Sequence, residues 1–274
     1  MISWAGIERP LFYLAMAAYL AAAFGAMGLL FKKQTLLNHT LKITLCAGLI
    51  FNGLAIAART LQAGYFPFTG MYEFGIVFVF ATVMLTVFLA RRYECRSLYA
   101  FVLPIMVILA VTVDLSYHGI KPLVPALKSC WLVIHVAAAV VAYGLLAAAC
   151  ATAGMYLWKQ RLAASGNERD LGPSLQGLDL MAGRLISWAI PFLTLLIITG
   201  AIWAEYAWGS YWQWDPKEIW SLITWVIYVI YLHGRRVLGW RGEKSMWLII
   251  LGFIAVLITF VGVNLFQQGL HAYF

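Results

Sequence analysis

Long apolar stretches alternate with short polar ones along the whole chain. A helix needs about 20 mainly apolar residues to cross a bilayer, because unpaired backbone amides in hydrocarbon cost several kcal/mol. The apolar stretches lie near residues 10–31, 41–58, 74–90, 98–113, 129–158, 184–204, 218–233 and 246–265. Two of them are short, and the fifth is long enough to project from the membrane. The pattern predicts an all-α, polytopic integral membrane protein with about eight transmembrane helices.

Composition supports the same class of protein. Of the 274 residues, 64% are hydrophobic and 11% are charged, and the mean hydropathy of +0.85 exceeds what soluble domains tolerate. No soluble domain, repeat or linker interrupts the pattern, so we expect residues 1–274 to form a single transmembrane domain. The start "MISWAGIERP" lacks the features of a cleaved signal peptide, so we expect the first span to remain in the mature protein.

Basic residues predict the orientation, since Lys and Arg collect in cytoplasmic loops. Fourteen of the 19 basic residues lie in one set of loops. The other set contains Arg9, Arg59, Lys121, Lys128 and Lys217. This asymmetry predicts that both termini lie outside. It also accounts for most of the net charge of +8. The sequence has no basic face interleaved with aromatic residues, so no nucleic-acid partner is expected.

Tryptophan is concentrated in "WGSYWQWDPKEIW", residues 208–220, which the same topology places outside. Scattered tryptophans suit the membrane interface. A cluster around one loop fits better a platform for a flat aromatic ligand, with an interfacial belt as the alternative. We call residues 203–220 the tryptophan segment. Within it, Asp215, Pro216 and Glu218 have the spacing of a capped helix start.

Two histidines are predicted on the same side as the tryptophan segment. His135 would lie about 9 Å along the fifth span, and His271 follows the eighth. Either one alone reads more simply as a hydrogen-bonded structural residue. As a pair they fit axial ligation of heme iron. His118, in a loop on the same side, could compete with His135.

His233 is expected about 22 Å deeper than Glu218 on the same helix, near the cytoplasmic surface. It would be either a second ligand position or an interfacial anchor beside Arg235 and Arg236. His39 reads as a solvated residue of an internal loop.

The aromatic external loop 59–73, with Glu73, could form another wall of the site. No C-x-x-C or C-x-x-C-H occurs, so neither a dithiol pair nor covalently bound heme is expected.

Three stretches together resemble a known family. They are "SCWLVIHVAAAVVAYGLL", "GAIWAEYAWGSYWQWDPKEIWSLITWVIYVIYLHGR" and "GVNLFQQGLHAYF". They look like the CcsA (ResC) subunit of the system II cytochrome c synthetase, a heme-handling protein with a tryptophan-rich "WWD" segment. The resemblance runs from 129 to 274, with weaker support from "FPFTGMYEF" at 66–74.

The resemblance implies a site for heme b. It makes His135 and His271 the axial ligands of an external heme, and His233 a ligand at an inner site. The second ligand of the inner site would come from a CcsB (ResB) partner, since no such half lies within the 274 residues. The positions that match the WWD segment are Trp208, Trp212, Trp214 and Asp215.

The function that the resemblance implies is cytochrome c biogenesis. Heme would be moved across the bacterial plasma membrane and presented on the periplasmic side to the C-x-x-C-H segment of an apocytochrome c. The client supplies the thiols, so no catalytic nucleophile is expected in this chain, which would be one subunit of a holocytochrome c synthase with heme lyase activity.

Three other functions remain as alternatives. A system I-type protein would deliver heme to a separate chaperone, although eight spans and "WDPKE" favour CcsA. A transporter would have paired broken helices at the midplane, and Pro104 and Pro191 make no convincing pair. A purely structural assembly factor would bind no heme.

Overall fold

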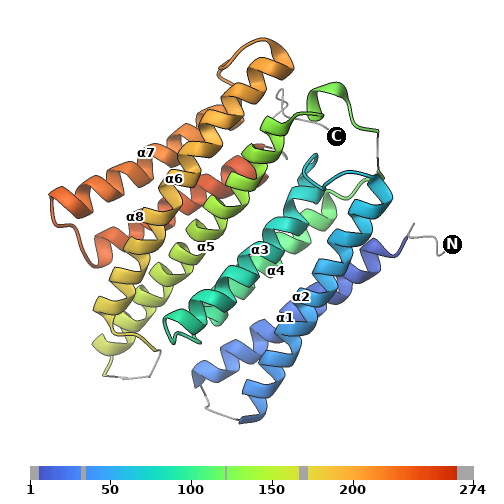
Figure 1. Ribbon diagram of the computed structural model, residues 1–274. Helices are drawn as coiled ribbons and strands as arrows, with labels where there is room; N and C mark the ends of the chain where they lie inside the picture. The colour runs from blue at the N-terminus through green and yellow to red at the C-terminus, as the bar shows by residue number, and fades with distance from the viewer. Residues whose placement is uncertain (1–5, 32–34, 121, 167–171, 264–274) are drawn as a thin grey trace. The chain divides into compact units, whose positions relative to one another are not determined.

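The computed structural model describes residues 6–31, 35–120, 122–166 and 172–263. Within these ranges the protein is helical and contains no strand (Figure 1), so the expected all-α fold is confirmed. The long helices are α1 (Glu8–Phe31), α2 (Thr35–Ala63), α3 (Met71–Arg92), α4 (Leu98–Leu115), α5 (Cys130–Ala164), α6 (Leu175–Trp208), α7 (Pro216–Val237) and α8 (Glu243–Leu257). A short 3-10 helix, η1 (Pro125–Leu127), precedes α5, and a π-helical turn, η2 (Ile258–Gly262), continues α8.

Seven of the eight long helices are long and apolar enough to cross a bilayer, and α7 is the exception among the described residues. Its sequence, PKEIWSLITWVIYVIYLHGRRV, carries indole and phenol rings along its length and charges at both ends. The helix predicted over 218–233 is therefore present, but it is less apolar than the others. The chain is a multi-pass membrane protein, and the outside location of both termini stays a prediction.

The helices extend beyond the predicted spans because hydropathy detects only their apolar parts. The first turns of α6 precede residue 184 and contain polar residues. Ser174 caps this helix, and its hydroxyl accepts a hydrogen bond from the Gly177 amide at 3.1 Å. Such a side-chain cap satisfies a backbone donor that the helix itself leaves without a partner.

The chain divides into two compact units, each described by itself. Unit 1 comprises Met1–Pro67, Tyr72–Lys121 and Leu162–Pro173, and contains α1 to α4. Unit 2 comprises Phe68–Met71, Pro122–Arg161 and Ser174–Phe274, and contains α6 to α8 with most of α5. The expectation of a single transmembrane domain stays a prediction.

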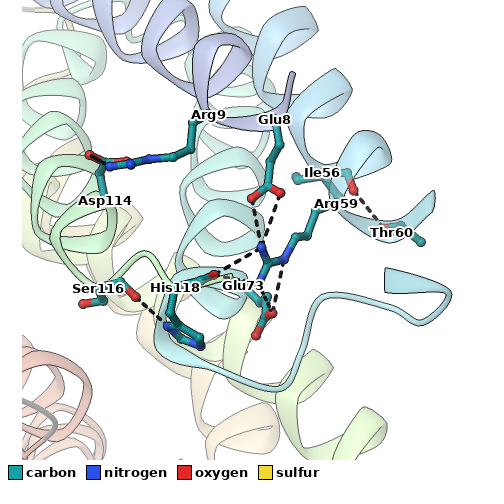
Figure 2. Close-up of polar contacts among 9 residues, drawn as sticks. All are labelled: Glu8, Arg9, Ile56, Arg59, Thr60, Glu73, Asp114, Ser116 and His118. Carbon is teal, nitrogen blue, oxygen red and sulfur yellow. Dashed lines mark hydrogen bonds and ion pairs between the residues drawn. The ribbon is translucent and has the colours of Figure 1, made fainter. Parts of the chain in front are cut away.

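A buried ion cluster joins three helices of unit 1. Arg59, 1% exposed, lies in α2 between two carboxylates (Figure 2). Its Nη2 is 2.7 Å from Glu73 Oε1 in α3, and its Nη1 is 3.4 Å from Glu8 Oε2 in α1. The guanidinium also donates to the carbonyl of His118, just beyond α4. Since a buried charge is tolerated only when paired, the cluster fixes these four segments together.

A second, more exposed pair lies in the same unit. Arg9 of α1 is 3.2 Å from the Asp114 carboxylate of α4, and Tyr13 donates a hydrogen bond to the same carboxylate. The Tyr117 ring packs under the Arg9 guanidinium at 4.3 Å and edge-to-face on Tyr72 at 4.9 Å. Aromatic rings and charges therefore alternate over this end of unit 1.

The predicted bounds of the loop 59–73 are wrong at both ends, since α2 continues to Ala63 and α3 begins at Met71. Arg59 belongs to α2 and Glu73 to α3, because each charge is neutralised within the unit and can lie in a helix. Glu73 is engaged inside unit 1, as is the Tyr72 ring. The His118 ring is engaged locally, with Nδ1 2.9 Å from the Ser116 carbonyl. The internal-loop position of His39 was also wrong, since this exposed residue lies in the first turns of α2.

In unit 2, α7 packs between α6 and α8 (Figure 1). Near the middle of α7, the Trp225 indole donates to the Thr194 hydroxyl of α6 at 2.9 Å. Near its end, buried Arg235 forms an ion pair with Asp179 of α6 at 2.7 Å. Between them, Tyr228 donates to a backbone carbonyl of α8. The helix is thus tied to its neighbours along its length, which holds the tryptophan segment at one end of α6 and α7.

Candidate functional site

The half-buried side chain of His135 lies in the second turn of α5. Its Nδ1 is 2.8 Å from the carbonyl oxygen of Leu196 in α6. A carbonyl only accepts hydrogen bonds, so Nδ1 is the donor. In the neutral imidazole the lone pair then belongs to Nε2, which is the nitrogen that can bind a metal.

Trp203 lies beside this imidazole. The two rings are nearly parallel, with an interplanar angle of 24° and centroids 6.4 Å apart. The indole is 2% exposed, and its Nε1 donates to the carbonyl of Ala126 in η1 at 2.9 Å. Trp203 therefore ties the segment before α5 to α6 around His135. The tryptophan segment was predicted as a platform for a ligand, and this structural contact of Trp203 was not predicted.

Trp208 ends α6 and continues the aromatic group. Its ring packs edge-to-face on Trp203, with centroids 4.9 Å apart. Gly209 follows in the left-handed conformation, φ +72°, and its amide donates to the Glu205 carbonyl at 2.8 Å. A glycine in this conformation is the usual end of a helix, since it has no Cβ to clash. The chain leaves α6 at a defined point and enters the loop of the tryptophan segment.

Trp212 and Trp214 form the second aromatic pair, edge-to-face at 5.8 Å. Ser210 donates a hydrogen bond to the Trp212 carbonyl at 3.1 Å. Trp214 is 70% exposed and has a φ of +59°. A bulky L residue adopts this conformation only at a cost of about 1–3 kcal/mol. The loop therefore presents an exposed indole on a strained backbone.

Glu218 holds that backbone in place. Its Oε2 accepts hydrogen bonds from the amides of Gln213 at 2.9 Å and Asp215 at 3.1 Å, the residues on either side of Trp214. Asp215 caps α7 by accepting from the Lys217 amide at 2.9 Å, and the reciprocal capping box is present. The predicted helix start is confirmed, and 5% exposed Asp215 acts in it as the cap.

Lys217 places a cation next to this cap. Burial lowers the pKa of its ammonium group to about 8, and the Asp215 carboxylate offsets part of that shift. The Lys217 ammonium group therefore loses its proton at a pH closer to neutral than an ordinary lysine does. Trp225, which lies beyond the tryptophan segment in α7, has a structural role through its bond to Thr194.

His233 lies near the other end of α7 and is exposed on unit 2. The alternative role of His233 was an interfacial anchor beside Arg235 and Arg236. Arg235 does not lie at the surface with it, because Arg235 is buried in the ion pair with Asp179. Arg236 is exposed and remains the neighbour that could share such a role.

His271 lies outside the described residues, so its pairing with His135 stays a prediction. The structure brings His135, Trp203 and Trp208 into one packed group, and Trp212, Trp214 and Asp215 into the loop that follows. Among the described residues, no three His, Cys, Asp or Glu side chains gather as they would around a metal ion. None of the four cysteines, all of which lie in the described ranges, forms a disulfide.

Two contributors to the site were missed from the sequence. The Leu196 carbonyl is a backbone group, which no side-chain pattern reveals. Gly200, one turn later, leaves the space that the imidazole fills: a Cβ there would lie 2.8 Å from His135 Nδ1 and Cε1. An isolated glycine inside an apolar helix was the available signal.

Comparisons with known proteins identify the family of this chain. Residues 68–271 match the family described as cytochrome C assembly protein. The chain is 33% identical to cytochrome c biogenesis protein CcsA of Trieres chinensis over 89% of either chain. It is 34% identical to the CcsA protein of Guillardia theta, covering 90% of this chain and 89% of that one. The CcsA protein of Microcystis aeruginosa is 35% identical, with 84% and 89% covered.

A solved structure shows the same fold. Cytochrome c heme lyase CcmF superposes with a TM-score of 0.72 at 16% identity, over 95% of this chain. The chain spans 47% of the length of that protein, so the likeness concerns the fold alone. The sequence matches extend over most of the chain and include the tryptophan segment. The protein therefore belongs to the CcsA family of cytochrome c assembly proteins.

Proposed function

We propose that this protein acts in cytochrome c biogenesis by holding heme at the outer end of unit 2, with His135 as one axial ligand. The observation that carries the proposal is the 2.8 Å hydrogen bond from His135 Nδ1 to the Leu196 carbonyl. Metal-binding histidines usually donate their other ring N–H to a carbonyl or carboxylate, which fixes the tautomer and the ring orientation. The Leu196 carbonyl is such a partner for His135.

The surrounding residues fit a flat, apolar ligand. Trp203 stacks beside the imidazole, and Trp208 packs on the edge of Trp203. Indole faces are suited to contact with a macrocycle, and they exclude water from the iron. Exposed Trp214, with its partner Trp212, would cover the ligand from the loop that follows α6. Asp215 supports this wall as the cap of α7.

The second external ligand in this proposal is His271, which follows α8 in the sequence. Two imidazoles give heme b a six-coordinate iron. An entering client histidine can then replace one of them without leaving the iron exposed to water. The proposal places both termini and the tryptophan segment on the periplasmic side of a bacterial plasma membrane.

His233 would act earlier, at an inner site. Its exposure on α7 suits a ligand that shares heme with a residue of a second protein. A CcsB (ResB)-like membrane subunit is the partner that family membership suggests. Heme would then travel from this inner site to His135.

The bond-forming chemistry would use groups from outside this chain. Bound heme supplies two vinyl groups, and each thiol of the client's C-x-x-C-H segment adds its S–H across one of them to give a thioether. The residues of this chain orient the ligand and exclude water. The protein would thus be a subunit of a heme lyase, with no nucleophile of its own.

Co-expression in a bacterium that lacks its own cytochrome c maturation system tests the proposal. A reporter with one C-x-x-C-H segment should acquire covalent heme, seen by heme staining of a denaturing gel, only when this chain and a ResB-like subunit are both present. The His135→Gly variant should abolish staining, and His118→Gly should not.

The system I-type alternative predicts that maturation depends on a different partner protein. Maturation would then require a periplasmic heme chaperone, which would be recovered with the tagged protein in a pull-down. Staining that persists without any ResB-like subunit and needs the chaperone would contradict the synthetase proposal.

A further inference from the structure

The imidazole of His135 packs against α6 at Gly200, which has no side chain. The three atoms nearest to a Cβ built at Gly200 all belong to the His135 ring, at 2.8 Å for Cε1 and Nδ1 and 3.8 Å for Cγ. Real Cβ atoms essentially never approach another heavy atom more closely than 3.0 Å. Any side chain at position 200 would therefore displace the ring.

The acceptor of the ring proton comes from the same face of α6. Leu196 precedes Gly200 by one helical turn, so its carbonyl points along the helix toward position 200. The imidazole can reach this carbonyl at 2.8 Å because the glycine leaves space for the ring. Thr199, between them, mainly bonds Leu195 at 2.6 Å and contacts the Leu196 carbonyl only at 3.4 Å.

We infer that Gly200 is a positioning residue for iron ligation. By admitting the imidazole to the Leu196 carbonyl, it sets the Nδ1–H tautomer and leaves the lone pair on Nε2. This inference deepens the proposed function, since it concerns the state of His135 that binds heme iron. Gly200 itself has no side chain and would not contact the iron.

A simpler role for a helix glycine is close packing of two backbones. The contacts argue against that role, because the atoms that approach Gly200 are those of the imidazole and not the backbone of α5. The two roles also predict different behaviour. Backbone packing would make a substitution at 200 harmful with or without His135, whereas positioning makes the harm depend on the imidazole.

The first test needs no heme. Solid-state NMR of protein labelled with ¹⁵N-histidine, with the His135 signal assigned by its loss in His135→Gly, reports which nitrogen carries the proton. We expect Nδ1–H in the wild-type protein and a shift toward Nε2–H in Gly200→Ala. Gly53→Ala is the matched control, since this half-buried helix glycine would place its Cβ 3.5 Å from Phe80, an ordinary contact.

The second test measures heme retained per protein after purification. We expect Gly200→Ala to lower retention by about tenfold or more, as commonly happens when a ligating histidine loses the acceptor of its other ring N–H. Gly53→Ala should leave retention unchanged. In a His135→Gly background, Gly200→Ala should cause no further loss. If Gly200→Ala alone fails to insert, adding His135→Gly should restore insertion, because the clashing ring is gone.

The outcomes separate the two proposals. Heme retention that is unaffected by His135→Gly would refute the heme site, while the NMR experiment would still test the positioning of the ring. An unchanged tautomer and unchanged retention in Gly200→Ala would overturn the inference about Gly200. So would a failure to insert that His135→Gly does not restore.

Discussion

The carboxylate of Glu218 lies 2.9 Å from the backbone nitrogen of Gln213, five residues earlier in the chain. The same oxygen accepts from the Asp215 amide at 3.1 Å. These two bonds flank Trp214 and stabilise its left-handed backbone. The capping box thus does more than start α7, because its Glu218 bonds also offset the backbone strain at exposed Trp214.

Replacing Trp214 with glycine should separate stability from ligand binding. We expect Trp214→Gly to raise the free energy of unfolding by about 1 kcal/mol, because relief of the backbone strain outweighs the added chain entropy. The same change should lower heme retention, since the indole is lost. Thermal unfolding in detergent and the heme-to-protein ratio measure the two effects.

Two variants control this experiment. Trp214→Ala should lower heme retention without the gain in stability. Trp247→Ala removes another exposed indole, from α8, and should leave retention unchanged. Full heme retention in Trp214→Gly would show that the indole is no part of the site and would favour the interfacial belt.

Arg59→Met should strongly destabilise unit 1. The change leaves the Glu8 and Glu73 carboxylates buried without their cation, and removal of one partner from a buried ion pair typically costs about 3–5 kcal/mol. Arg9→Met is the control, because Arg9 is part-exposed and its pair with Asp114 should contribute at most about 1 kcal/mol. Equal shifts of the melting temperature in the two variants would contradict a structural role for the buried cluster.

The orientation can be tested with reporter fusions. A fusion after Asp215 and one at the C-terminus should report the periplasmic side, and a fusion after Gly242 should report the cytoplasm. The reason is the excess of basic residues in one set of loops. A cytoplasmic signal after Asp215 would contradict the topology and would place the tryptophan segment on the wrong side for a periplasmic client.

Replacement of His233 should interrupt the supply of heme. In cells that also contain the ResB-like subunit, we expect His233→Ala to reduce the heme that reaches the outer site, with partial recovery in added imidazole. Arg236→Ala is the control, because it alters an exposed neighbour on the same helix without removing a ligand. Normal cytochrome maturation in His233→Ala would make the residue an interfacial anchor only.

The helices and the capping box could be predicted because both depend on neighbouring residues. Apolar runs locate the spans, and Asp215 and Glu218 stand three residues apart at the start of α7. Arg59 and Glu73 were misplaced because a hydropathy pattern ends a helix at a charge. It carries no information about a neutralising partner on another helix, such as Glu8.

The roles within the site depended on tertiary packing. His135 and its acceptor, Leu196, are 61 residues apart, and only the packing of α5 on α6 brings them together. Trp203 and Trp225 look like the other clustered tryptophans in the sequence. Their N–H groups donate to Ala126 and Thr194, which makes them structural ties between segments. No composition or spacing distinguishes those indoles from exposed Trp214.

The most direct measurement is the absorption spectrum of the purified protein, wild type and His135→Gly, with and without imidazole. We expect the wild-type protein to show the six-coordinate, low-spin spectrum of a bis-imidazole heme b. His135→Gly should insert normally, retain less heme and lose that spectrum, and free imidazole should restore part of it by filling the vacated position. An unchanged bis-imidazole spectrum in His135→Gly would contradict the proposed site.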